Sequence, residues 1–110
     1  MFSADLKRGS MEMLILAVLD GPPRHGYEIG KSLEARSEGR LEFKASTLYS
    51  VLYRMEKKRW IKGRWVEKEG ERRRCRYSLT SDGREELAKQ RSAWRSFVET
   101  VDLVVGGSHA

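Results

Sequence analysis

The stretch KASTLYSVLYRMEKKRW, from Lys44 to Trp60, combines an apolar stripe with a polar and basic face. Four apolar residues recur at the i, i+3, i+4 and i+7 spacing of one helix side: Leu48, Val51, Leu52 and Met55. That spacing predicts an α-helix whose apolar side is buried. The opposite side carries hydroxyl, phenol and cationic groups, namely Ser46, Thr47, Tyr49, Ser50, Tyr53, Arg54 and Lys57. We expect this side to face water or a partner.

The size and charge of the chain narrow the kind of partner. A chain of 110 residues is expected to form one domain with a modest core. Its 22 Lys and Arg residues against 16 Asp and Glu residues leave a net charge of +6. Such an excess of positive charge favours a polyanionic partner, although many basic proteins bind no nucleic acid.

Several classes of protein are excluded by what the sequence lacks. The longest apolar run, Met13 to Leu19, is too short to span a bilayer and has no signal-peptide flanks, so a cytoplasmic protein without membrane contact is expected. Cys75 is the single cysteine, and no His/Cys spacing suits zinc, so neither a disulfide nor a metal or other cofactor is implied. No nucleophile and base, carboxylate pair or phosphate loop is visible, which argues against an enzyme; His25 is more typical of a cap or a packing residue.

Two further helices are expected before the Lys44–Trp60 stretch. The first runs from about Leu6 to Leu19, with Ser10 as its N-cap if it begins late, and the segment Asp20–Pro23 ends it. The second follows RHGYEIGKSLEARS, where the cost of Gly30 in a helix predicts close approach by a neighbouring helix. A short helix, a turn and a helix with a polar outer face match the helix-turn-helix pattern.

From Ile61 to Leu79 the period of the pattern changes to two. Residues 61, 63 and 65 alternate in one run and 75, 77 and 79 in another, on either side of EKEGERR, which predicts a β-hairpin. Arg72 and Arg73 lie near its tip, and Arg74 and Arg76 are expected on a basic outer face, pointing away from the side of Cys75 and Tyr77. Cys75 is expected to be a small inward-facing residue. A helix-turn-helix followed by a basic hairpin is the winged-helix arrangement, in which one helix enters the major groove and the wing contacts the backbone or minor groove.

The last element expected is a long helix from Ser81 to about residue 106, with Thr80 or Ser81 as N-cap and a disordered tail at residues 107–110. Its apolar residues step by 7, 4, 3 and 4, which is typical of a helix-helix seam. The first helix is also too apolar for a small monomer to surround. We therefore expect a homodimer with these interface residues: Leu14, Val18, Leu87, Trp94, Val98 and Val101. Trp94 is also a candidate for contact with a flat ligand.

These segments together resemble the PadR family of bacterial transcriptional regulators, in the short form with a single C-terminal helix. The matching pieces are LILAVLDGPPRHGYEI (14–29), TLYSVLYRMEKKRWI (47–61), Trp65 and RYSLTSDGREEL (76–87), in this order and spacing. The resemblance implies a mainly α fold with a small β-hairpin: a winged helix-turn-helix DNA-binding domain at residues 1–80 and a dimerisation helix at 81–106. It also implies a homodimeric repressor of a palindromic operator on double-stranded DNA, released by a small aromatic or phenolic effector.

The residues expected to contact DNA lie in the helix at 44–57 and in the wing. They are Lys44, Ser46, Thr47, Tyr49, Ser50, Tyr53, Arg54, Lys57, Arg72, Arg73 and Arg74. Ser46 and Ser50 depart from the family's common Gly and Pro, so base preference is not carried over. The alternative is a winged-helix protein-interaction module whose basic face docks an acidic protein.

Overall fold

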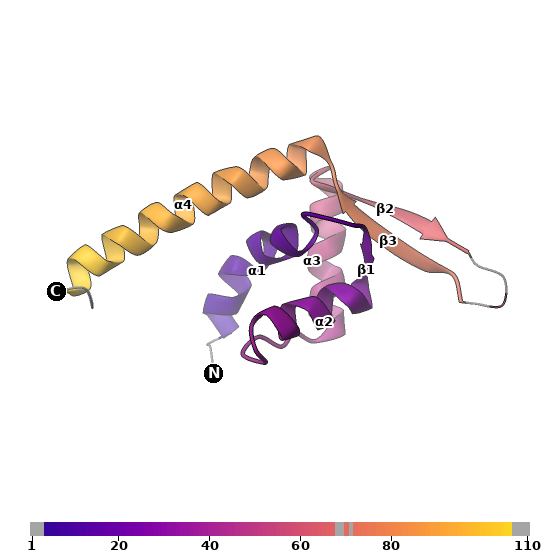
Figure 1. Ribbon diagram of the computed structural model, residues 1–110, viewed down its shortest axis with the longest axis horizontal. Coiled ribbons are helices and arrows are strands. Elements are labelled where there is room, and N and C mark those ends of the chain that lie inside the picture. The colour runs from indigo at the N-terminus through magenta and orange to yellow at the C-terminus, as the bar shows by residue number, and fades with distance from the viewer. Residues whose placement is uncertain (1–3, 68–69, 71, 107–110) are drawn as a thin grey trace.

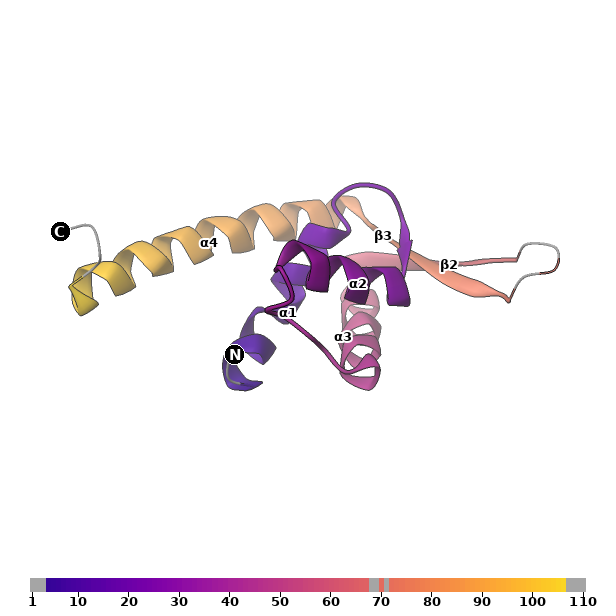
Figure 2. The same cartoon turned by 60° about the horizontal axis from the view of Figure 1, so that its bottom comes forward.

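The computed structural model describes residues 4–67, 70 and 72–106. Its elements are α1 (Ala4–Val18), β1 (Arg24–His25), α2 (Gly26–Arg36), α3 (Ala45–Lys57), β2 (Ile61–Val66), β3 (Arg74–Leu79) and α4 (Ser81–Val105). Helices α1 to α3 form the body, the β2–β3 hairpin extends from one end of it, and α4 extends from the other (Figures 1 and 2). The expected fold class, mainly α with a small β-hairpin, is confirmed. The tail expected at residues 107–110 lies outside the described residues.

The hydrophobic core joins the three body helices to the base of the hairpin. Leu48, Val51, Leu52 and Met55 of α3 are at most 4% exposed, as the i, i+3, i+4, i+7 spacing predicted. They pack with buried residues of the other elements, namely Ile15, Leu16, Ile29, Leu33, Ile61 and Leu79. Burying a side chain of this size contributes about 1.5–3 kcal/mol, so this stripe fixes α3 firmly to the body.

Two details of the expected helices are corrected. α1 begins at Ala4, so Ser10 lies inside the helix and is not its N-cap. Val18 and Leu87, which were expected at a dimer interface, are each only 2% exposed within the core of one protomer. Their side chains are already covered by the same chain, because both belong to the core in which α1 and α4 are in contact.

The sheet has three antiparallel strands in the order β1-β3-β2, one more than the hairpin that the sequence predicted. β1 is only two residues long, with Arg24 opposite Tyr77 and His25 opposite Arg76. A two-residue strand carries no periodicity, so only the presence of β3 beside it makes it a strand. The backbone N–H of His25 then donates to the Glu28 carboxylate at 3.0 Å, which confirms His25 as the N-cap of α2.

The junction before α4 is tightly packed. Thr80 is the N-cap of α4: its hydroxyl oxygen accepts from the Gly83 N–H at 3.0 Å and donates to the Arg59 carbonyl at 2.6 Å. The backbone N–H of Thr80 donates to the Trp60 carbonyl at 3.0 Å. A Cβ added at Gly83 would overlap the carbonyl oxygen of Trp60 and lie 2.9 Å from its carbonyl carbon. The first turn of α4 is thus held directly against the turn that follows α3.

Candidate nucleic-acid interface

The outward side of α3 gathers the polar and basic residues that the sequence singled out. The side chains of Ser46, Thr47, Tyr49, Ser50, Tyr53, Arg54 and Lys57 are all exposed, and Lys44 is exposed at the N-cap. The Lys57 ammonium lies 5.0 Å from the centroid of the Tyr53 ring, within range of a cation–π interaction. Arg54 and Lys57 also lie in the last turn, where cations are stabilised by the helix dipole.

Two glycines of α2 face α3. A Cβ added at Gly30 would lie 3.5 Å from Leu48 Cδ2, an ordinary van der Waals contact, so Gly30 faces the neighbouring helix but the packing there leaves room for a methyl group. A Cβ added at Gly26 would overlap the phenol of Tyr49. Tyr49 is 47% exposed, so one part of its ring packs on α2 while the rest remains on the outward side of α3.

The register of the hairpin separates its residues into two faces. Tyr77 is buried, Cys75 is half-buried, and a Cβ added at Gly63 would lie 3.3 Å from the Glu56 carboxylate, so this inner face turns toward α3. The outer face carries four cations: Lys62, Arg64, Arg74 and Arg76. Arg64 stands directly opposite Arg76, and like charges at opposed positions destabilise a sheet unless an anion offsets them.

Lys62, Arg64 and Arg76 were absent from the residues that the sequence suggested for DNA contact. The signal was present, because period-two alternation places residues 62 and 64 opposite to Ile61 and Gly63, on the outer side of the strand. Arg76 is half-buried, since β1 places His25 beside it across the sheet.

Arg72, Arg73 and Arg74, the wing arginines expected to contact DNA, are all exposed. Arg74 lies opposite Val66 on the outer face. Arg73 lies over the ring of Trp65, with its guanidinium carbon 5.0 Å from the ring centroid. Trp65 pairs with Cys75 and therefore belongs to the inner face, so the structure directs Arg73 and Arg74 to opposite sides of the hairpin. Residues 68, 69 and 71 of the tip lie outside the described part of the chain.

Burial sets the ionisation of the two inner-face groups. Desolvation raises the pKa of the Cys75 thiol, with the Glu56 carboxylate adding to the rise. Desolvation also raises the pKa of Tyr77, with smaller contributions from Cys75 and Glu56. Both groups are therefore neutral at physiological pH, and Cys75 occupies the small, inward-facing position that the sequence predicted.

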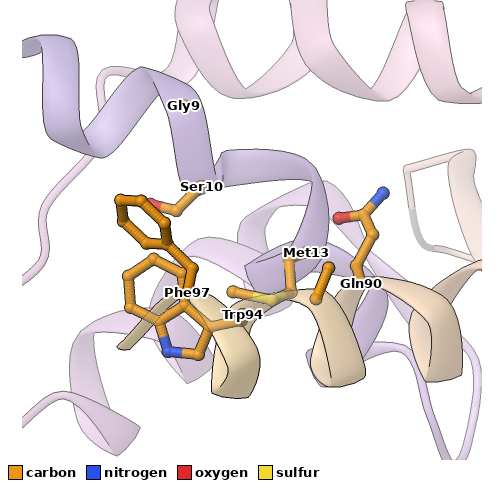
Figure 3. A pocket seen from close by; sticks show the side chains of 7 residues that line it. Gly9, Ser10, Met13, Gln90, Trp94 and Phe97 are labelled. Atoms are coloured by element: carbon orange, nitrogen blue, oxygen red, sulfur yellow. The ribbon is translucent and has the colours of Figure 1, made fainter. Parts of the chain in front are cut away.

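A cavity of about 360 Å³ lies between α1 and α4, away from the α3 face (Figure 3). It is lined by Gly9, Ser10, Met13, Gln90, Ala93, Trp94 and Phe97. The rings of Trp94 and Phe97 are 6.3 Å apart between centroids, at an interplanar angle of 42°. Of these residues the sequence indicated only Trp94. Phe97 follows it at i+3, so helical spacing placed it on the same side.

The apolar stripe of α4 continues past this cavity without a cover from the same protomer. Trp94, Val98 and Val101 are 43%, 38% and 37% exposed, and Phe97 is 60% exposed. Leu14, the remaining expected interface residue on α1, is half-buried. Exposed apolar area that follows one helix stripe is typical of a protein interface.

Two further features are absent from the described residues. Across residues 4–67, 70 and 72–106, no group of three or more His, Cys, Asp or Glu side chains is arranged to hold a metal ion. Within those same ranges, no helix has the length and apolar character needed to cross a membrane.

Comparison with known proteins gives the family. Residues 15–89 match the transcriptional regulator PadR-like family. An uncharacterised protein of Lysinibacillus sphaericus is 31% identical over 107 residues, covering 97% of this chain and 98% of that protein. A transcriptional regulator from Clostridium thermocellum is 28% identical with a TM-score of 0.85, covering 93% of this chain and 96% of that one. Bacillus subtilis PadR, solved in complex with operator DNA, shares the fold at 22% identity with a TM-score of 0.66, covering 73% of this chain and 45% of that one. The chain therefore belongs to the PadR-like family of transcriptional regulators, which are not enzymes.

Proposed function

We propose that this protein binds double-stranded DNA sequence-specifically as a homodimer and acts as a ligand-responsive repressor. The observation that carries the proposal is the outward side of α3, where hydroxyls, phenols and two cations are exposed on a helix held rigidly by its buried stripe. Hydroxyl groups can donate or accept at base edges and phosphates, and Lys57 and Arg54 can neutralise phosphates. The operator complex of Bacillus subtilis PadR, a more distant relative with the same fold, supports this assignment.

In this proposal α3 enters the major groove and the hairpin contacts the adjacent backbone or minor groove. The opposed pair Arg64 and Arg76 supports the role of the wing, because a polyanion would relieve their mutual repulsion. The basic residues of α3 and the wing would contact phosphates. Bases or sugars would be contacted by Thr47, Tyr49, Ser50 and Tyr53. Sequence preference would then depend mainly on the hydroxyl-bearing side of α3.

A homodimer would cover the stripe of α4 that one protomer leaves exposed. We propose an interface formed by Leu14 together with Trp94, Phe97, Val98 and Val101, without Val18 and Leu87, which the protomer's own core already covers. Two-fold symmetry would place two α3 helices on the half-sites of a palindrome, about one helical turn apart.

The cavity beside Trp94 is the proposed effector site. A small aromatic or phenolic compound fits a space of about 360 Å³ that has two rings on one wall and Met13 on another. Because the cavity lies between α1 and α4, an occupant would change the angle between the two DNA-binding halves of the dimer. Such a ligand shifts the DNA-binding equilibrium only by its difference in affinity for the two states.

A footprint and band-shift titration on the upstream region of the protein's own gene tests DNA binding. The log of the binding constant should fall with the log of salt concentration by about 0.9 for each phosphate contacted, and roughly 6 to 10 contacts are expected for a dimer. Lys57→Ala should weaken binding and reduce this slope. Lys89→Ala is the matched control, because it removes the same charge from the exposed surface of α4, outside the residues proposed to contact DNA.

Protection of a palindrome would support the proposal and exclude a module that only docks acidic proteins. Absence of protection, or equal effects of the Lys57 and Lys89 variants, would contradict it. Adding candidate aromatic compounds to the same footprint tests the effector, with Trp94→Ala as the variant that should lose the response.

A further inference from the structure

We infer that Trp65 is a positioning residue that holds the Arg73 guanidinium on the α3 side of the hairpin for contact with a DNA phosphate. The inference rests on the proposed function and deepens it by naming which wing arginine is ordered before DNA arrives. The sequence placed Arg74 on the outer face and Arg72 and Arg73 near the tip, and the structure distinguishes Arg73 by a ring contact.

The first observation is that Trp65 does not serve the core. It is 58% exposed, although Ile61 on the same strand is only 2% exposed. The hairpin extends beyond α3, so no helix covers its inner face in the half nearer the tip (Figures 1 and 2). An exposed indole at this position buries little area against the body and contributes little to the stability of the fold.

The second observation is the contact that the indole does make. The guanidinium carbon of Arg73 lies 5.0 Å from its centroid, and an arginine over a tryptophan face is the strongest common form of cation–π pair. Contact with the ring restricts the rotamers of a long side chain, so less conformational freedom is lost when the guanidinium meets a phosphate. The stack leaves the N–H groups at the guanidinium edge available to donate to oxygen.

The third observation is the face of the hairpin on which Trp65 lies. Cross-strand partners share a face, so Trp65 lies on the same face as Cys75 and Tyr77, which turn toward α3. In the proposed function a duplex that receives α3 also runs beside the hairpin, so its phosphates can meet cations on either face of the wing. Arg64 and Arg74 point to the outer face and have no such ring contact among the described residues.

A double-mutant cycle tests the inference with labelled duplex from the gene's upstream region. Trp65→Ala should weaken binding about two- to fivefold for each wing engaged, the expected value of an exposed cation–π pair. Its salt slope should be unchanged, because the Arg73 charge remains. Arg73→Ala should weaken binding more and reduce the slope by about 0.9 for each wing. In the Arg73→Ala background, Trp65→Ala should weaken binding by less than a further factor of about two.

Trp65→Tyr should restore most of the affinity lost in Trp65→Ala, because a phenol ring also supports a cation. Arg64→Ala is the matched control: it removes a charge from the neighbouring position on the opposite face, so its effect should simply multiply with that of Trp65→Ala. Thermal melts of every variant, together with the upfield NMR shift of the Arg73 side chain in the free protein, report folding and the stack independently of DNA.

The possible outcomes separate the two proposals. Binding by the unaltered protein with independent effects of Trp65→Ala and Arg73→Ala would overturn the positioning role alone. An unchanged affinity of Trp65→Ala for the duplex would overturn it as well, since the ring would then contribute nothing to the phosphate contact. Failure of the unaltered protein to bind DNA would overturn the proposed function and this inference with it.

Discussion

Replacing Gly83 with alanine should destabilise the protein strongly. The added methyl would overlap the Trp60 carbonyl, a backbone group that cannot rotate away, so α4 must shift from the turn after α3. Overpacking costs about 1–3 kcal/mol, and weakening the Thr80 bonds to Trp60 and Gly83 costs about 1 kcal/mol each. The better helix propensity of alanine returns less than about 1 kcal/mol. The net loss is about 2–4 kcal/mol.

The measurement is thermal unfolding by circular dichroism at one fixed protein concentration, because dimerisation would make the midpoint concentration-dependent. For a chain of this size, a loss of 2–4 kcal/mol lowers the midpoint by about 8–16 °C. Gly30→Ala is the matched control, since its methyl would meet Leu48 only at 3.5 Å. That variant should be unchanged or up to about 1 kcal/mol more stable. A Gly83→Ala protein as stable as the Gly30→Ala protein would refute the reasoning.

Three further predictions concern the cap, the interface and the thiol. Thr80→Ala removes the cap of α4 and should cost about 1–2 kcal/mol, seen as a melting midpoint about 4–8 °C lower; an unchanged midpoint would mean that Thr80 does not hold the junction. Val101→Glu places a charge in the exposed stripe and should give a folded monomer in sedimentation experiments, whereas an intact dimer would place the interface elsewhere. Burial raises the pKa of the Cys75 thiol. The buried thiol should therefore stabilise the fold fully below the ordinary thiol pKa of 9.0, and this stabilisation should decline as the pH rises above 9.0. Cys75→Ala should lessen that alkaline decline, and an identical pH profile would contradict the assignment.

The stripe and the outward side of α3 were predictable because both depend on local geometry. Helical period alone places Leu48 and Met55 on one side and Ser50 and Lys57 on another, whatever the rest of the chain does. The same holds for the two runs of the hairpin, since an alternation of two requires only that each run is extended. The capping of α4 by Thr80 is equally local, because its side chain reaches a backbone N–H three residues later.

The errors lie where a residue's environment depends on distant parts of the chain. Val18 and Leu87 have the apolar character of interface residues, and only the packing of α4 on α1 shows that one protomer already covers them. Trp65 lies on the inner face that alternation gives it, but its exposure depends on the tertiary structure, because the hairpin extends beyond the helix that would cover it (Figure 1). β1 requires β3 as its neighbour, and a two-residue segment contains no pattern of its own.

The sequence by itself determined the order of the helices and the hairpin, the buried side of α3 and the positive charge of the chain, because these follow from residue type and short-range spacing. The tertiary structure alone decided that the Arg73 guanidinium lies over the Trp65 ring and that Gly83 lies against Trp60. Strand register and helix packing bring together residues that are far apart in the chain. The periodicity of a single segment does not predict which distant residues it will contact.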